Sequence, residues 1–328
     1  MSSSRAGGFV CAVLMACAPA VSVAQKAAKD YPSKPIRLVV PYATGGGLDF
    51  IAHSMAQRIT RSIGQNLFVD NRSGAGGAIG TDAVAKSPPD GYTILMTSSA
   101  HASLPVVMKS LPYDPVADFT PITMVARNVG LVLVVHPSVP ARSIKELVAL
   151  AKAHPGKLNY GSGGVGSITQ FSAELFNMMA GTQIAHVPYK GVGQAVIDVL
   201  AGRIDACYIV GPGVLEHIRS GRLRALGIAA PTRWSGLPDV PTIAEGGVKG
   251  YSYDIWYGLW FPAGTPVEYV TRIRSEVVKV SDDPEAKRTF AAQGYILVGS
   301  TPQEFSKAIV DEIELHRRLV AQMGFTPQ

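Results

Sequence analysis

Short apolar runs alternate with amphipathic stretches along most of this chain. Residues 36–40 follow Pro35 and form an apolar run rich in β-branched residues, interrupted only by Arg37, which is typical of a strand buried on both faces. A glycine turn follows. From Leu48 to Ile63 the apolar residues then recur at helical spacing, with polar residues on the opposite face. The pattern predicts a strand, a loop and a helix.

The same unit recurs further along the chain. Ser143 with Glu146, and Thr301 with Glu304, have the spacing of residues that cap the start of a helix. Alternation of this kind predicts an α/β fold with mostly parallel sheets flanked by helices. The further strands are expected at 67–69, 92–97, 131–135, 159–161, 183–187, 205–210, 223–228 and 255–261, and the further helices at 75–86, at 143–153, from Pro266 and from Pro302.

The length of the chain bears on the number of lobes. Its 328 residues exceed what one hydrophobic core usually supports, so we expect two lobes. No polar linker separates two halves, which favours two crossings between the lobes. We expect one lobe to comprise residues 31–125 and 246–328, and the other to comprise residues 126–245.

The first 24 residues have the features of a secretory signal peptide. Arg5 precedes an apolar run at 9–23, and Ser22-Val23-Ala24 forms a small-residue cleavage site. This predicts export to the periplasm. A lipoprotein processed at Cys17 is the alternative.

Composition and motifs exclude several classes of function. The formal net charge is +6 without a block of Lys or Arg, which argues against a nucleic-acid partner. Cys207, in an apolar stretch, is expected to be a buried and unreactive thiol. Neither a nucleophile elbow nor a metal-binding histidine pattern is present, so we expect no enzyme, no metal and no cofactor. The helical histidines at 53, 154, 217 and 316 are expected at the surface or its boundary.

Two glycine-rich loops carry the functional signal, at residues 44–47 and 161–167. Each follows a predicted strand and leads into a predicted helix, where unpaired backbone N–H groups bind anions. Tight turns are the plain alternative. The second loop also matches G-x-G-x-x-G, but the next strand lacks the acidic residue of a dinucleotide site. Asp49 is either a helix N-cap or a contact to the ligand, through water or an ammonium group.

Six segments resemble signatures of the Bug family, the substrate-binding proteins of tripartite tricarboxylate transporters, and they stand in the family's order. The resemblance implies a type II periplasmic binding protein fold, with two α/β lobes joined by two hinge crossings. The segments are residues 35–49, 70–80, 88–94, 186–191, 221–226 and 237–246.

The resemblance also implies a binding site, since in the family both glycine loops hold a ligand carboxylate through amides, hydroxyls and ordered waters. Thr44 and Gln170 depart from the residues usual in the family, which leaves the identity of the carboxylate open. The implied ligand-binding residues are Tyr42, Thr44, Gly46, Gly47 and Asp49 in one lobe, Ser162, Gly163, Gly164 and Ser167 in the other, and Ser98, Ser99 and Asp205 at strand ends nearby.

The implied function is that of a monomeric periplasmic solute-binding protein. It would capture a small carboxylate, an aliphatic di- or tricarboxylate or an aromatic acid, by hinge closure, and deliver it to the membrane subunits of a tripartite tricarboxylate transporter. Two alternatives stay open. One is an input protein for a membrane signalling receptor, and the other is an exported hydrolase with Ser162 or Ser167 as nucleophile and a histidine that the sequence does not reveal.

Overall fold

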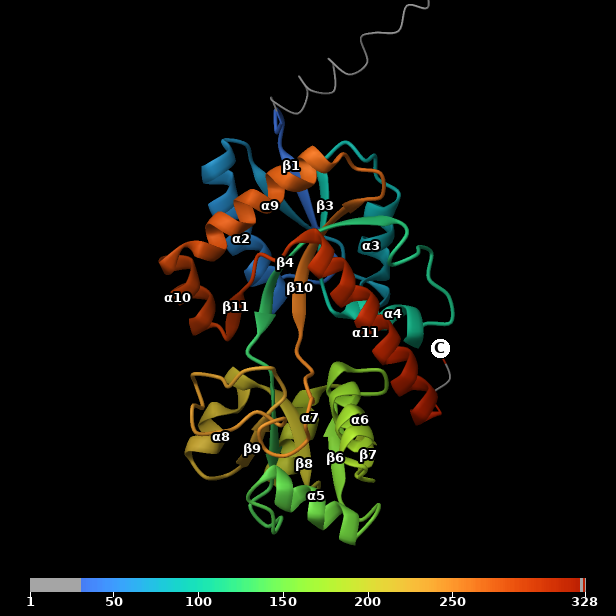
Figure 1. Ribbon diagram of the computed structural model, residues 1–328, viewed down its shortest axis with the longest axis vertical. Helices are drawn as coiled ribbons and strands as arrows, with labels where there is room; N and C mark the ends of the chain where they lie inside the picture. The colour runs from blue at the N-terminus through green and yellow to red at the C-terminus, as the bar shows by residue number, and fades with distance from the viewer. Residues whose placement is uncertain (1–30, 325–326, 328) are drawn as a thin grey trace, which may run out of the picture.

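The computed structural model describes residues 31–324 and residue 327, which form two β-sheets surrounded by helices (Figure 1). The predicted signal peptide and Cys17 lie outside the described residues. The six-stranded sheet has the order β11-β4-β10-β3-β1-β2, with β1 (Ile36–Val40), β2 (Leu67–Asn71), β3 (Thr93–Ser98), β4 (Phe119–Asn128), β10 (Trp256–Pro262) and β11 (Tyr295–Leu297). The five-stranded sheet has the order β7-β6-β8-β5-β9, with β5 (Leu131–Val135), β6 (Asn159–Ser162), β7 (Ala185–Pro188), β8 (Ala206–Val210) and β9 (Arg224–Ile228).

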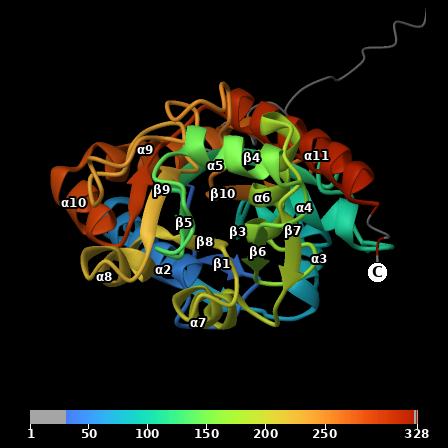
Figure 2. The same cartoon turned by 90° about the horizontal axis from the view of Figure 1, so that it is seen from below.

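Helices cover both faces of each sheet, and α5 and α7 lie on opposite sides of the five-stranded sheet (Figure 2). The helices around the six-stranded sheet are α2 (Gly47–Ile63), α3 (Ala78–Ala85), α4 (Ala100–Val107), α9 (Val267–Asp282), α10 (Pro284–Ala292) and α11 (Pro302–Met323). Those around the five-stranded sheet are α5 (Ile144–Ala153), α6 (Ile168–Ala180), α7 (Val192–Leu200) and α8 (Leu215–Arg219). The chain also forms two 3₁₀ turns, η1 (Ala75–Gly77) before α3 and η2 (Gly211–Val214) after β8.

The chain passes from one sheet to the other between β4 and β5, and it returns ahead of β10 (Figure 1). Near this edge of the first sheet, Tyr257 at the start of β10 lies opposite Ser98 at the end of β3, and β1 and β2 run parallel to β3. In the other sheet, Leu131 at the start of β5 lies opposite Val210 at the end of β8, and β6 runs parallel to β8. The carboxyl ends of β1, β2, β3, β6 and β8 therefore all lie toward the crossings, on facing edges of the two sheets.

Both sheets are mixed, whereas the pattern predicted mostly parallel sheets. β10 is antiparallel to β3 and β4, and β5 is antiparallel to β8 and β9. These two strands are antiparallel to their neighbours because each is the first strand after the chain crosses from the other sheet. A strand that enters a sheet from the crossing edge runs away from that edge, opposite to strands whose carboxyl ends point to it.

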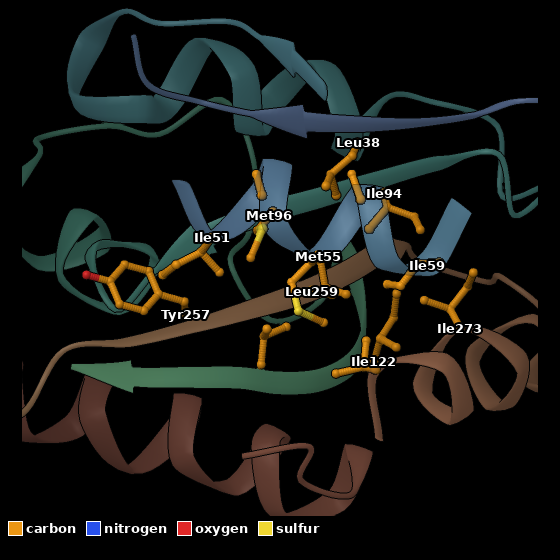
Figure 3. Close-up of a cluster of buried hydrophobic side chains, with 14 of the residues drawn as sticks. Leu38, Ile51, Met55, Ile59, Ile94, Met96, Ile122, Tyr257, Leu259 and Ile273 are labelled. Atoms are coloured by element: carbon orange, nitrogen blue, oxygen red, sulfur yellow. The ribbon is translucent and has the colours of Figure 1, made fainter. Parts of the chain in front are cut away.

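Side chains on both faces of the six-stranded sheet are buried, as the apolar run of β1 predicted. Leu38 and Val40 belong to one apolar cluster and Val39 to another, because successive strand residues point to opposite faces. One face of α2 packs on the first of these clusters (Figure 3). Its members include Leu38, Ile51, Met55, Ile59, Ile94, Met96, Ile122, Tyr257, Leu259 and Ile273.

The helix predicted at 75–86 begins at Ala78, because Gly76 and Gly77 have φ of 65° and 105°, outside the range of a right-handed helix. The sequence pattern did not predict β4 or β11. The predicted N-caps are confirmed, but the capping box at Ser143 is incomplete, because the Glu146 carboxylate accepts the N–H of Arg142 and not that of Ser143. The Ser143 hydroxyl accepts the Glu146 N–H, and Thr301 and Glu304 form a full capping box.

α11 joins the two cores. Its first half contributes Phe305, Ile309 and Ile313 to the core of the six-stranded sheet, while Leu319 belongs to a core of the five-stranded sheet. Within residues 31–324 and 327, no helix has the length and apolar character needed to cross a membrane.

Candidate functional site

The first glycine loop connects β1 to α2, and residues 43–47, including Thr44, are exposed. Gly46 is the N-cap residue of α2 and supplies no side-chain hydrogen bond to the helix. The first N–H groups of a helix have no partner within it. The backbone N–H groups of Gly47 and Leu48 also have no hydrogen-bond acceptor elsewhere among the described residues. Two donors with partial positive charge are therefore unpaired at this edge.

Gly46 and Gly47 are glycines for different reasons. A Cβ on Gly47 would collide with the Tyr295 hydroxyl, so packing requires glycine there. A Cβ on Gly46 would meet no atom within 4 Å, and its φ of −85° suits any residue. Packing therefore does not explain Gly46, whereas unpaired helix N–H groups would.

Asp49 stabilises the first loop and is not the helix N-cap, so that alternative was wrong. Its Oδ2 accepts the Gly45 N–H at 2.9 Å, and its Oδ1 accepts from Nδ2 of Asn71 at 3.0 Å. Burial alone would raise the pKa of Asp49, but these hydrogen bonds and the nearby His53 lower it. The charge of Asp49 is thus stabilised by donors of the protein.

Asn71, at the end of β2, is a site residue that the sequence reasoning missed, although it lies in one of the six signature segments. Its amide also donates to the Tyr42 carbonyl at 3.0 Å, so it joins both ends of the first loop. The hydroxyls of Ser98 and Thr97 interact with that of Tyr42, whose pKa burial raises. Tyr42 and Ser98 therefore lie at the same edge as the loop.

Ser99 is buried beside the returning crossing, where its N–H donates to the Trp256 carbonyl at 2.9 Å. The structure brings together, at this edge of the first lobe, all of the residues predicted for it.

The second glycine loop, between β6 and α6, satisfies its own amides. The N–H groups of Gly163, Gly164 and Gly166 donate to Thr169 Oγ1 at 2.9 Å, Ser162 Oγ at 3.1 Å and Gln170 Oε1 at 2.7 Å. The expectation that Gly163 and Gly164 offer free amides is therefore not met in this structure. Serine and threonine hydroxyls in a loop compete for nearby N–H groups.

Ser162 is fully buried, and its Oγ lies 2.6 Å from Nε2 of His186 on β7. Its hydroxyl also bonds the N–H and the carbonyl of Gly164. The Ser162 hydroxyl thus stabilises the loop. Because Ser162 is fully buried, it does not fit the predicted role of contacting the ligand. Ser167, in contrast, is half-buried, and its Oγ caps α6 through the Gln170 N–H at 3.3 Å.

The start of α7 is a second feature that the sequence reasoning missed. Gly191 is its N-cap and supplies no side-chain bond, and the N–H groups of Val192 and Gly193 have no partner among the described residues. The Val192 nitrogen would lie 3.4 Å from a Cβ on Gly163, so this helix start is beside the second loop. The sequence feature that could have revealed this helix start is Gly191, the last residue of the signature segment 186–191.

The second loop also approaches the first lobe. A Cβ on Gly166 would lie 3.3 Å from Val107 of α4. Together with the strand directions, this contact places the α2 start in one lobe and the α7 start in the other on facing edges.

Asp205 lies away from these edges, so its predicted position near the loops is wrong. It precedes β8, and its Oδ2 accepts the N–H of Asn159, the first residue of β6, at 2.8 Å. Because β6 and β8 are parallel, Asp205 is at the end of the sheet opposite Ser162. A residue that precedes a strand cannot share an edge with residues that follow its parallel neighbour.

Two predictions about single side chains had opposite outcomes. Cys207 is buried, and burial raises the pKa of its thiol to about 12, as expected for an unreactive core residue. His316 was expected at the surface or its boundary but is buried against Phe171 and Tyr253, and burial lowers its pKa to about 4. Within the described residues, no group of His, Cys, Asp and Glu side chains is arranged to hold a metal ion.

Comparison with known proteins identifies the family of this chain. Residues 51–325 match the model of the "Tripartite tricarboxylate transporter family receptor". The chain belongs to this family. Protein BugT of Bordetella pertussis is 40% identical to this chain over 300 residues, which cover 90% of this chain and 91% of BugT. The resemblance to Bug proteins is thereby confirmed.

Solved structures confirm the fold class. The structure of R. palustris Rpa4515 with adipate is 34% identical, with a TM-score of 0.73, and the match covers 91% of this chain and all of that one. The structure of MatC from Rhodopseudomonas palustris with bound malate is 27% identical, with a TM-score of 0.69, and the match covers 88% of this chain and all of that one. This receptor therefore has the two-sheet α/β fold of those binding proteins.

Proposed function

We propose that this chain is a monomeric periplasmic receptor that captures a small dicarboxylate between the facing edges and delivers it to a tripartite tricarboxylate-type membrane transporter. The observation that carries the proposal is the pair of uncapped helix starts, α2 in one lobe and α7 in the other. In this arrangement one carboxylate binds the amides of Gly47 and Leu48. The other end of the ligand meets the amides of Val192 and Gly193 when the lobes close.

The energetics of the amide contacts fit such a mechanism. A charge-assisted hydrogen bond contributes roughly 1.5–3 kcal/mol, so four amides supply about 6–12 kcal/mol before the entropy cost of binding. Micromolar affinity corresponds to about 8 kcal/mol. Shifting the lobes from 1:99 to 99:1 closed requires a difference of about 5.5 kcal/mol between the two states. Contacts to both lobes, made only in the closed state, provide that difference.

The ligand class draws support from the relatives. Adipate and malate, each present in the structure of a related protein, are both dicarboxylates. A ligand with two carboxylates matches two separate helix starts better than an aromatic monocarboxylate does. Asp49 does not repel it strongly, because Gly45 and Asn71 already donate to its oxygens.

A hydrolase with Ser162 as nucleophile is disfavoured, although the structure does bring a histidine to this serine. The Gln170 amide nitrogen lies 3.2 Å from Nδ1 of His186, while Gln170 Oε1 accepts the Gly166 N–H. The Gln170 NH₂ group thus donates to Nδ1, and the proton of a neutral His186 is on Nε2. An Nε2 that already bears a proton cannot act as general base toward Ser162.

Binding is tested by calorimetric titration with adipate and malate, with the uncharged dimethyl adipate as control. Thermal unfolding provides a second measurement, because a ligand at 100 times its Kd stabilises the native state by about 2.7 kcal/mol. We expect binding and stabilisation by the diacids and neither by the diester. The proposal fails if millimolar dicarboxylates neither bind nor stabilise the protein.

The transport role is tested by recovering membrane partners with the loaded and the empty protein. Preferential recovery of the transporter's membrane subunits by the loaded form supports delivery. Recovery of a signalling receptor in their place would assign the protein to sensing.

A further inference from the structure

A continuous chain of hydrogen bonds connects the second glycine loop to β7. It begins where the Gly166 N–H donates to Gln170 Oε1 at 2.7 Å. Gln170 Nε2 lies 3.2 Å from Nδ1 of His186, and Nε2 of His186 lies 2.6 Å from Ser162 Oγ. Ser162 closes the chain with two contacts of 3.1 Å to the backbone of Gly164.

The position of each proton in this relay follows from what each group can donate. The Gly166 N–H can only donate, so the amide oxygen of Gln170 faces it and the NH₂ faces His186. Nδ1 of His186 then accepts and Nε2–H donates to Ser162. The serine oxygen accepts a second hydrogen bond from the Gly164 N–H and donates its own proton to the Gly164 carbonyl. Each group in the relay thus faces its neighbour with a donor opposite an acceptor.

We propose that His186 is a positioning residue for ligand binding, whose neutral imidazole, protonated on Nε2 alone, holds the second glycine loop in the geometry that closes on the carboxylate. The inference rests on the proposed function. A second proton on Nδ1 would face the NH₂ group of Gln170, donor against donor. The bond between Gln170 and His186 then breaks, and Gly166 and Gly164 lose their common support.

The surroundings of His186 favour the neutral form. Tyr160 of β6 stacks on the imidazole at 5.0 Å between ring centroids, and the Tyr160 hydroxyl donates to Glu174 of α6 at 2.6 Å. Ser162 from β6 and Gln170 from α6 are its hydrogen-bond partners. Glu174 is the one carboxylate on β6, β7 and α6, and it is thus hydrogen-bonded to Tyr160. Burial lowers the pKa of His186.

The expected pH dependence follows from the sign of that shift. At neutral pH, His186 is neutral and the relay is intact, so affinity is constant. As the pH falls through the lowered pKa of His186, the added proton opposes binding, and affinity decreases by up to about tenfold per pH unit. The ionisation of the ligand acts in the same direction, so the test must separate the two.

The experiment measures the Kd for malate by calorimetric titration from pH 5 to pH 8 in the full chain. His186→Gln removes the titrating group, and His154→Gln, at an exposed histidine at the end of α5, is the matched control. We expect H186Q to bind more weakly at pH 8 and to show a smaller acid loss than the wild type. H154Q should keep the full wild-type profile.

Gln170→Glu provides the converse test. Its carboxylate still accepts the Gly166 N–H, and its second oxygen accepts from a protonated Nδ1, so the relay survives in acid. We expect Q170E to have weaker affinity at pH 8 but to lose no further affinity through His186 on acidification. Identical profile shapes in the wild type, H186Q and Q170E would overturn the inference.

The imidazole ¹⁵N shifts give a reading that is independent of the ligand. The His186 signals, assigned by their disappearance in H186Q, should show a protonated Nε2 and an unprotonated Nδ1 at neutral pH. The opposite tautomer would refute the relay even where binding is normal. Failure of the wild type to bind any dicarboxylate at pH 8, with this tautomer present, would refute the proposed function while leaving the hydrogen-bond assignment in place.

Discussion

Replacement of Gly46 by aspartate places a carboxylate of the protein where we propose that the ligand carboxylate binds. The backbone of Gly46 has φ −85° and ψ 171°, which any residue can adopt, and a Cβ there meets no atom within 4 Å. Aspartate is also a preferred N-cap residue, because its side chain accepts N–H groups of the first helical turn. We therefore expect G46D to fold and to bind dicarboxylates poorly.

The substitution G46D should slightly increase the stability of the fold and strongly decrease the affinity for the ligand. Capping gains a few tenths of a kcal/mol over glycine, and the helix dipole adds about 0.3–1 kcal/mol, part of which repulsion from Asp49 offsets. Affinity loses two charge-assisted hydrogen bonds, those from Gly47 and Leu48, at roughly 1.5–3 kcal/mol each. Kd for adipate should therefore rise by about 10²–10⁴-fold.

Calorimetric titration with adipate and malate measures the loss, and thermal unfolding of the unliganded protein measures stability. Gly46→Asn is the matched control, since it caps the same amides without a charge, and it should lose less affinity than G46D. If G46D bound adipate within threefold of the wild type, the start of α2 would not be the carboxylate site.

Three further predictions concern other parts of the molecule. Burial raises the pKa of Glu312 to about 8, so Glu312 stays protonated in the native protein at pH values where it ionises in the unfolded chain, and the wild type loses stability as the pH rises from about 4.5 to 8. Glu312→Gln can still accept from Trp256, and its stability relative to the wild type, measured by urea unfolding, should be higher at pH 8.5 than at pH 5. An equal difference at both pH values would refute this. Cys207 should resist a thiol reagent at pH 8 until urea unfolds the protein, and fast labelling of the native state would contradict its burial. Gly164→Ala should destabilise the fold by about 1–3 kcal/mol, measured by urea unfolding, because Gly164 has φ 120° and a Cβ would lie 2.9 Å from the Tyr189 carbonyl oxygen; unchanged stability would show that the loop can rearrange.

Local patterns predicted most of the elements. The run at 36–40 is buried on both faces, the apolar face of α2 packs on the sheet, and Thr301 with Glu304 caps α11. β4 escaped prediction because its residues neither alternate nor form an uninterrupted apolar run around Pro121. Its strand character comes from pairing with β10 and β11, which are distant in sequence.

Part of the candidate site could likewise be predicted from residues adjacent in sequence, and part could not. Glycine followed by an amphipathic stretch predicted the unpaired start of α2, because the residues of a helix N-terminus are adjacent in sequence. Nothing in the sequence places His186 beside Ser162, or Asp205 at the far end of the sheet. Those positions depend on which strands pair and in which direction.

The sequence by itself determined most of the elements, the two lobes and the two glycine loops, since these depend on the period of apolar residues and on glycine within a few positions of each other. Only the tertiary structure decided which backbone N–H groups are left unpaired. The second loop is rich in glycine but bonds its own hydroxyl and amide groups, whereas the start of α7 beside it has unpaired donors. Whether an N–H group is free depends on every acceptor near it in space, and the folded chain brings those acceptors from separate segments.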